Sequence, residues 1–173
     1  MKIKSIIHSE AEFSKDRAKT HRYLLKKVWD NKKPMATIVM LNPRGETDAL
    51  YLDKSVMLFM NFCIGAKYGG MFIVNLWSYR TQSEKELIRI AYSKRRDVNT
   101  DNWIRHAVNE SEKLYIGWGS NKNRNKRINQ FKELLNRCKK INIVRLNTED
   151  DRMVHLSRST VNKKERIITI DQI

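Results

Sequence analysis

Four short apolar runs, separated by amphipathic helical patterns, constrain the fold of this chain more than any other feature. Each run has five or six residues and is rich in aliphatic side chains, and Arg145 is the one charged residue among them; this composition is typical of a strand buried on both faces. Between them, apolar residues recur at helical spacing, as Val56, Phe59 and Cys63 do within 53–67. The runs are 36–41, 71–76, 114–118 and 141–146.

Strands that alternate with helices predict a parallel sheet with helices packed on both faces. Further helices are expected from Ser83, from Asn99 or Thr100, and over 128–138. Residues 21–29 can form a strand or a helix, with a strand favoured, and 166–170 favour an additional edge strand. We therefore expect one domain over 1–173, of α/β class. Its architecture would be a three-layer α/β/α sandwich with a mostly parallel central sheet.

The charge of the chain indicates an anionic partner. Lys and Arg number 35 against 19 Asp and Glu, a formal net charge of +16. Nucleic acid is the first candidate, and an acidic protein or an anionic membrane surface comes next. The alternative is a basic surface that serves solubility alone.

Several other classes of protein are not indicated. No apolar run approaches the roughly 18 residues that span a bilayer, and residues 1–10 lack the apolar core of a secretory signal. Cys63 and Cys138 lie on apolar helical stripes, which is typical of core thiols. No Cys/His set and no phosphate-cradling glycine loop is present, so we expect no metal, no cofactor, no membrane association and a cytoplasmic location.

In parallel α/β sheets the ligand lies beyond the carboxyl ends of the strands. Asn42, held by Pro43 after the first run, can orient a water or read a base edge; alternatively it bonds its own backbone in a turn. Asn75 ends the second run and can read a uracil-like edge. Trp77 and Tyr79 suit stacking on bases, although either can equally pack in the core.

Cations and a histidine follow the same strand ends. Arg44 and Arg80 are candidate phosphate contacts, and so is the basic stretch 122–127, which can also be a solvated loop before a helix. His155 could stabilise a developing anion, with two further donors beside it. The candidates in these two segments are Lys122, Arg124, Lys126 and Arg127, and then His155, Ser157 and Arg158.

Five motifs together resemble a bacterial and phage family, domain of unknown function 1643. The resemblance covers roughly residues 20–160, and that family is similar in organisation to the uracil-DNA glycosylase superfamily. The motifs are Met40-Leu41-Asn42-Pro43, Tyr68-Gly69-Gly70, Asn75-Leu76-Trp77-Ser78-Tyr79-Arg80-Thr81, Asn99-Thr100-Asp101-Asn102 and Gly117-Trp118-Gly119.

This resemblance implies roles for three residues. Asn42 resembles the asparagine that positions the attacking water, Asn75 the one that reads the uracil edge, and His155 the histidine that stabilises the departing uracil anion. The segment His155-Leu156-Ser157-Arg158 resembles the second glycosylase motif, His-Pro-Ser, but carries Leu156 where the superfamily has proline. We therefore expect a pseudo-glycosylase that binds DNA in a basic groove, with an active glycosylase as the alternative. A third possibility is an interaction module for acidic, DNA-mimicking proteins such as glycosylase inhibitors.

Overall fold

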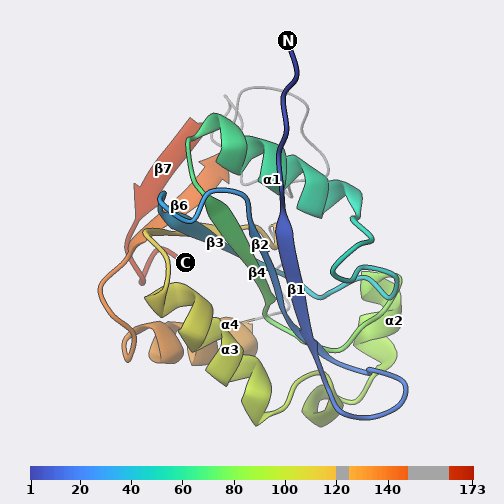
Figure 1. The fold of residues 1–173 in the computed structure, drawn as a ribbon. Helices are drawn as coiled ribbons and strands as arrows, with labels where there is room; N and C mark the ends of the chain where they lie inside the picture. The colour runs from blue at the N-terminus through green and yellow to red at the C-terminus, as the bar shows by residue number, and fades with distance from the viewer. Residues whose placement is uncertain (120–124, 148–163) are drawn as a thin grey trace.

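A computed structural model describes residues 1–119, 125–147 and 164–173 of the chain. Its seven-stranded sheet has the order β1-β2-β4-β3-β5-β6-β7 (Figure 1). The four strands β4, β3, β5 and β6 are mutually parallel, whereas the pairs β1–β2, β2–β4 and β6–β7 are antiparallel. The strands are β1 (His8–Phe13), β2 (Arg22–Val28), β3 (Met35–Met40), β4 (Gly70–Asn75), β5 (Lys113–Ile116), β6 (Asn142–Asn147) and β7 (Lys164–Ile168).

The α/β class is confirmed, but the expectation of a mostly parallel sheet is not supported. Half of the strand pairings are antiparallel, so the sheet is mixed. The apolar runs in the sequence predicted only the four mutually parallel strands, β3, β4, β5 and β6. The β1 strand alternates between exposed and half-buried side chains, so it has no continuous apolar run to reveal it.

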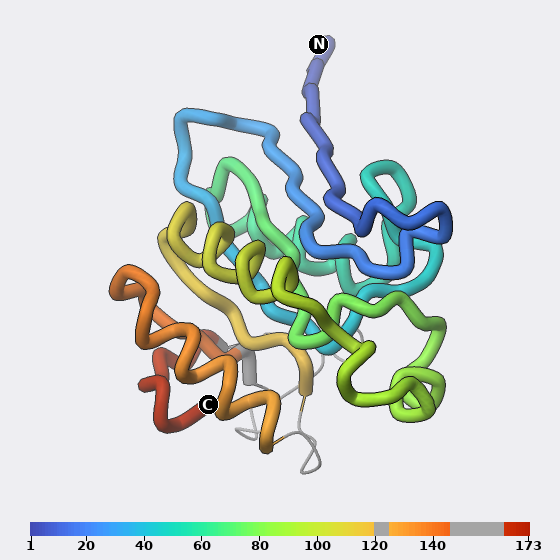
Figure 2. The backbone as a smooth tube through the Cα atoms, turned by 90° about the horizontal axis from the view of Figure 1, so that it is seen from below, coloured from blue at the N-terminus to red at the C-terminus, as the bar shows by residue number. Residues whose placement is uncertain are grey.

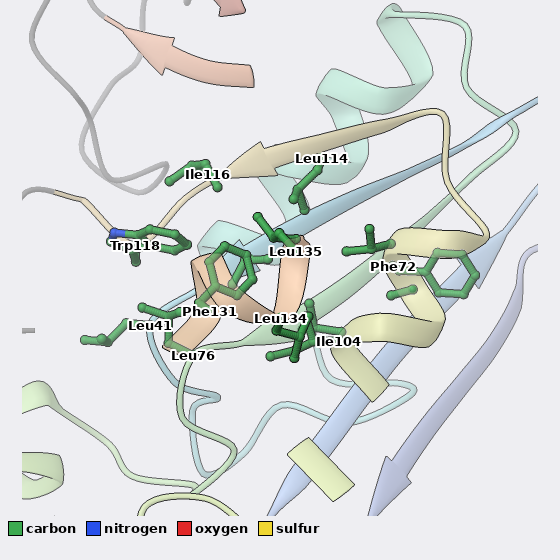
Figure 3. Packing of buried hydrophobic residues seen from close by; sticks show 14 of the residues in the cluster. Leu41, Phe72, Leu76, Ile104, Leu114, Ile116, Trp118, Phe131, Leu134 and Leu135 are labelled. Carbon is green, nitrogen blue, oxygen red and sulfur yellow. The ribbon is translucent and has the colours of Figure 1, made fainter. Parts of the chain in front are cut away.

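Helices cover both faces of the sheet. On one face α1 (Lys54–Gly65) contributes Val56, Phe59 and Cys63 to a core cluster. On the other face α3 (Val98–Asn109) and α4 (Asn125–Leu135) lie side by side (Figure 2). The larger core cluster lies beneath them, and Figure 3 shows Ile104 of α3 and Phe131 of α4 packed within it. The short α2 (Glu84–Arg89) and a 3₁₀ turn (Tyr92–Lys94) connect β4 to α3.

Local chemistry fixes the ends of these helices. The Asp53 carboxylate accepts hydrogen bonds from the backbone N–H groups of Ser55 and Val56, which caps α1. Asp97, rather than Asn99 or Thr100, caps α3, and Thr100 completes a reciprocal capping box with it. The sequence favoured Asn99 or Thr100 as the cap, and the bond from the Thr100 N–H to the Asp97 carboxylate assigns that role to Asp97.

Gly69 is required by close packing, not by a left-handed backbone. A Cβ at this position would lie 1.8 Å from the carbonyl oxygen of Asp30 in the loop between β2 and β3. The left-handed residue after α1 is instead Lys67, with φ of 64°. Gly69 thus allows the end of α1 to pass directly over that loop before β4 begins.

The order of the four parallel strands defines a switch point. From β3 the chain passes through α1 to β4, and then returns through α3 to β5 on the opposite side of β3. In open α/β sheets, ligands bind outside the carboxyl ends of the strands where the order reverses. We call this region the carboxyl edge: residues 40–47 after β3, 75–82 after β4, 117–119 after β5, 125–127 at the start of α4, where Arg127 donates to the Leu76 carbonyl, and His21 and Arg22 at the start of the antiparallel β2.

Candidate functional site

Arg22 and Asn75 form a buried polar pair at the carboxyl edge. Each side chain belongs to a residue that is only 2% exposed. The Arg22 guanidinium donates from Nη2 to Asn75 Oδ1 at 3.3 Å and from Nη1 to the carbonyl of Thr47 at 3.4 Å. Burial lowers the pKa of Arg22 to about 10, so the group still carries its charge at neutral pH.

An irregularity in the β1–β2 ladder explains why this arginine points to the α1 face. Glu12 pairs with Leu24 and the next residue of β1, Phe13, pairs with Arg22, so β2 contains one extra residue, Tyr23. Such a bulge re-aims the side chains beside it. Arg22 thereby reaches Asn75, which by strand alternation shares the α1 face with Ile73.

Asn42 and Asn75 end neighbouring parallel strands. Met40 pairs directly with Asn75, and Asn42 follows Met40 by two residues, so the two carboxamides belong to the same face of the sheet by alternation. Asn42 is half-buried, and its Nδ2 donates to Thr81 Oγ1 at 2.8 Å and to the carbonyl of Pro43 at 3.3 Å. The first of these bonds ties the loop after β3 to the loop after β4, and the second joins the Asn42 carboxamide to the backbone of the next residue.

Trp77 lies in the core instead of lining an open base pocket. It is 3% exposed and packs edge-to-face against Tyr92 at 4.9 Å between ring centroids. Its ring also has the guanidinium groups of Arg95 and Arg127 at 5.6 and 5.9 Å. The expectation that Trp77 stacks on a base is therefore not met in this structure, because both faces and edges of the indole are enclosed by protein.

Tyr79 and Arg80, in the loop after β4, contact the end of β1 and the segment between β1 and β2. Tyr79 is half-buried and packs edge-to-face on His21 at 5.4 Å. Arg80 donates to the carbonyls of Lys19 and Gly45, and its guanidinium lies over the Phe13 ring. Arg80 is thus partly committed to holding the loop after β3 against the β1–β2 connection.

Arg127 is a structural arginine in this structure. It is fully buried, donates from Nε to the carbonyl of Leu76 at 2.7 Å and forms an ion pair with Asp101 at 2.6 Å. Asp101 also pairs with Arg96 at 2.9 Å. The expected phosphate contact by Arg127 is corrected accordingly, because its helix turns the side chain inward to join α3, α4 and the loop after β4.

A chain of hydrogen bonds adjoins the edge on the α3 side. The His21 ring bonds Ser78 Oγ at 2.8 Å, and Ser78 bonds Thr100 Oγ1 at 2.7 Å within the α3 capping box. Desolvation lowers the pKa of His21, with a smaller opposing effect from the Asp97 charge. Tyr23 donates to Asp97 at 2.7 Å, so this network holds the start of β2 on α3.

Two of the expected phosphate contacts are exposed in the structure. Arg44 lies in the loop after β3, and Lys126 lies in the first turn of α4 with its ammonium 5.3 Å from the Tyr92 ring centroid. The remaining candidates Lys122, Arg124, His155, Ser157 and Arg158 lie outside the described residues.

Buried donors without acceptors gather at the carboxyl edge. Among the described residues, Arg22 Nε, Asn75 Nδ2, Arg80 Nε and Arg127 Nη1 each expose less than 1 Å² and have no hydrogen-bond partner. Buried polar groups are nearly always paired, so each such group calls for an explanation. The sequence did not indicate Arg22, since it lies in a strand pattern with no motif around it.

The described part of the chain contains neither a cluster of metal-binding side chains nor a helix that could span a membrane. No group of three or more His, Cys, Asp or Glu side chains there could hold a metal ion. No helix in that part is long and apolar enough to cross a membrane.

Comparison with known families gives one match. Residues 22–155 match the model of a family described as Protein of unknown function (DUF1643). The chain belongs to this family. The matched segment begins at Arg22 and includes Asn42, Asn75 and Asp101, so the DUF1643 region contains the carboxyl edge described above except for His21. No curated protein and no solved structure gives a match.

Proposed function

We propose that this DUF1643 protein binds nucleic acid at its carboxyl edge, as a glycosylase-like protein without glycosylase activity. The observation that carries the proposal is the set of buried N–H donors without acceptors at that edge. Nucleic acids offer acceptors, namely phosphate oxygens and the carbonyl oxygens of bases. Satisfying buried donors is worth more than forming the same bonds on an open surface.

The electrostatics of the chain support a polyanionic ligand. The net charge is +16, and Arg44 and Lys126 are exposed beside the buried donors. Phosphate contacts by such residues release counterions, so the affinity should fall steeply with salt. They position a strand without reading its sequence, so the expected sequence preference is weak.

Base excision requires an activated water and a stabilised leaving base. An asparagine carboxamide cannot accept a proton at neutral pH, and Asn42 already donates to Thr81 and to Pro43. The nearby Asp53 carboxylate is committed to Thr47 and to the N-terminus of α1. Together with Leu156 in place of the second-motif proline, these commitments favour binding over excision.

An active DNA glycosylase is the second candidate. It is favoured by the placement of Asn42 and Asn75 at the ends of neighbouring parallel strands, on one face of the sheet. A water held by one carboxamide and a base read by the other would then be adjacent. The resemblance implies this arrangement for a base-excision enzyme.

One experiment distinguishes nucleic-acid binding without excision from an active glycosylase. Single- and double-stranded oligonucleotides containing uracil are incubated with the protein, abasic sites are detected by alkaline cleavage, and binding of the same oligonucleotides is measured at two salt concentrations. We expect salt-dependent binding without cleavage. Cleavage that disappears in Asn42→Ala would establish the glycosylase instead. If neither binding nor cleavage occurs, the positive charge serves an acidic protein partner.

A further inference from the structure

The Arg22 guanidinium is a buried cation without a bonded anion among the described residues. Its hydrogen bonds to the Thr47 carbonyl and to Asn75 Oδ1 are long, at 3.4 and 3.3 Å, and its Nε has no partner. Asp53 and Asp48 attract it only at longer range. Both carboxylates are otherwise occupied, Asp53 with the α1 cap and Asp48 with the N–H groups of Leu50 and Tyr51.

A buried charge is costly unless an opposite charge lies against it. We propose that Arg22 and Asn75 form a phosphate-binding subsite, in which Arg22 Nε and Asn75 Nδ2 donate to the oxygens of a terminal phosphate group. This inference rests on the proposed nucleic-acid binding, and it identifies a terminal phosphate as the part of the ligand that contacts these buried residues. The phosphate comes from the end of a strand or from a free nucleotide.

The unpartnered atoms favour a phosphate over a neutral base. Both are donors, and no unpartnered acceptor accompanies them in this pair, since Asn75 Oδ1 already accepts one hydrogen bond from Arg22. A neutral base would also leave the charge of Arg22 uncompensated. A phosphate monoester supplies only acceptors together with close to two negative charges at neutral pH.

Burial favours a terminal group over an internal phosphodiester. Arg22 Nε and Asn75 Nδ2 expose less than 1 Å² each. An internal phosphate carries a sugar on both sides and contacts groups on an open surface. A terminal phosphate has one such substituent and three free oxygens, so it needs less space beside these buried donors, and its binding would displace the long bond from Arg22 to Thr47.

The test compares oligonucleotide ends on the full-length protein. Single-stranded oligonucleotides of one sequence are prepared with a 5′-phosphate, a 3′-phosphate or hydroxyl groups at both ends, and binding is followed by fluorescence anisotropy. One of the phosphorylated forms should bind about tenfold or more tightly than the hydroxyl form, since one charge-assisted hydrogen bond has an effect of that size. Inorganic phosphate and a nucleoside monophosphate should compete for this added affinity.

The decisive variant is Asn75→Asp, which places a carboxylate where the phosphate would bind. It should fold with at least the thermal stability of the wild type, because the new carboxylate pairs with Arg22, and the preference for a phosphorylated end should disappear. Asn61→Asp, on the exposed face of α1, carries the same charge change and should retain the preference.

Each result decides a separate question. Equal binding of all three ends, with no effect of inorganic phosphate, would overturn the subsite while leaving nucleic-acid binding in place. Binding of phosphate or mononucleotide that is lost in Asn75→Asp, with no binding of any oligonucleotide, would keep the subsite and overturn the proposed function. A preference that persists in Asn75→Asp would assign the phosphate to another site.

Discussion

Asp101→Asn should destabilise the fold because it leaves the buried positive charge of Arg127 without its carboxylate partner. The guanidinium of Arg127 is fully buried, whereas Asp101 is 25% exposed and also pairs with Arg96. Removing one partner of a buried pair costs roughly 3–5 kcal/mol. The exposure of Asp101 and the oxygen that asparagine retains reduce the expected loss of unfolding free energy to about 2–3 kcal/mol. For a chain of this length that corresponds to a fall in Tm of roughly 4–12 °C.

A double variant separates a stranded charge from a simple loss of contacts. Asp101→Asn/Arg127→Met removes the cation along with its partner and fills the space beside Trp77 with an apolar side chain. Urea unfolding should show that it recovers about 1 kcal/mol or more relative to Asp101→Asn, although the Leu76 carbonyl loses its donor. Glu10→Gln is the control, because its pair with Lys26 is 59% and 30% exposed and should contribute less than about 1 kcal/mol.

Two results would refute this reasoning. A loss below about 1 kcal/mol in Asp101→Asn would mean that the guanidinium does not depend on Asp101 for compensation. A double variant as unstable as the sum of the two single variants would mean that the two side chains act independently.

Two further predictions concern pH and packing. Because burial lowers the pKa of His21 below the unfolded value of 6.5, the unfolded chain binds more protons, so the contribution of this group to stability is complete above that value and is lost as the pH falls through the folded pKa. His21→Phe should remove this part of the pH dependence, measured as the difference between wild-type and variant unfolding free energies from pH 8 to about pH 5; an unchanged profile would assign the dependence to other groups. Gly69→Ala should lower Tm by several degrees because its Cβ would lie 1.8 Å from the Asp30 carbonyl, whereas Gly65→Ala, with no atom within 4 Å of the added Cβ, should leave Tm unchanged or raise it. Equal melting temperatures for these two glycine variants would contradict the packing described at the end of α1.

Much of the central sheet was predictable because burial on both faces leaves a direct mark in the sequence. The runs that form β3, β4 and β5 are largely apolar, the run of β6 is apolar apart from Asn142 and Arg145, and the helical stripes between the runs predict α1, α3 and α4. The antiparallel strands at the edges of the sheet have a weaker hydrophobic pattern in the sequence. The β1 strand has one face half-buried and one exposed, so its apolar content is low.

The candidate site was predicted only where position along a strand decides it. Asn42 and Asn75 follow strand ends and therefore meet at one edge. The roles of Trp77 and Arg127 depended on which way each side chain points, and both point into the interior. Arg22 could not be identified because a one-residue bulge, set by pairing with β1, aims it at Asn75.

The most direct test of nucleic-acid binding at the carboxyl edge is a salt titration of affinity for a single-stranded oligonucleotide. The double variant Arg44→Gln/Lys126→Gln removes two exposed cations at that edge, and Lys139→Gln/Lys140→Gln removes two exposed cations that precede β6, at the opposite edge. We expect the first variant to reduce the slope of log K against log salt by about 1.4, from two phosphate contacts at roughly 0.7 each, and the second variant to leave the slope unchanged. An unchanged slope in the first variant, or an equal reduction in both, would contradict binding at this edge.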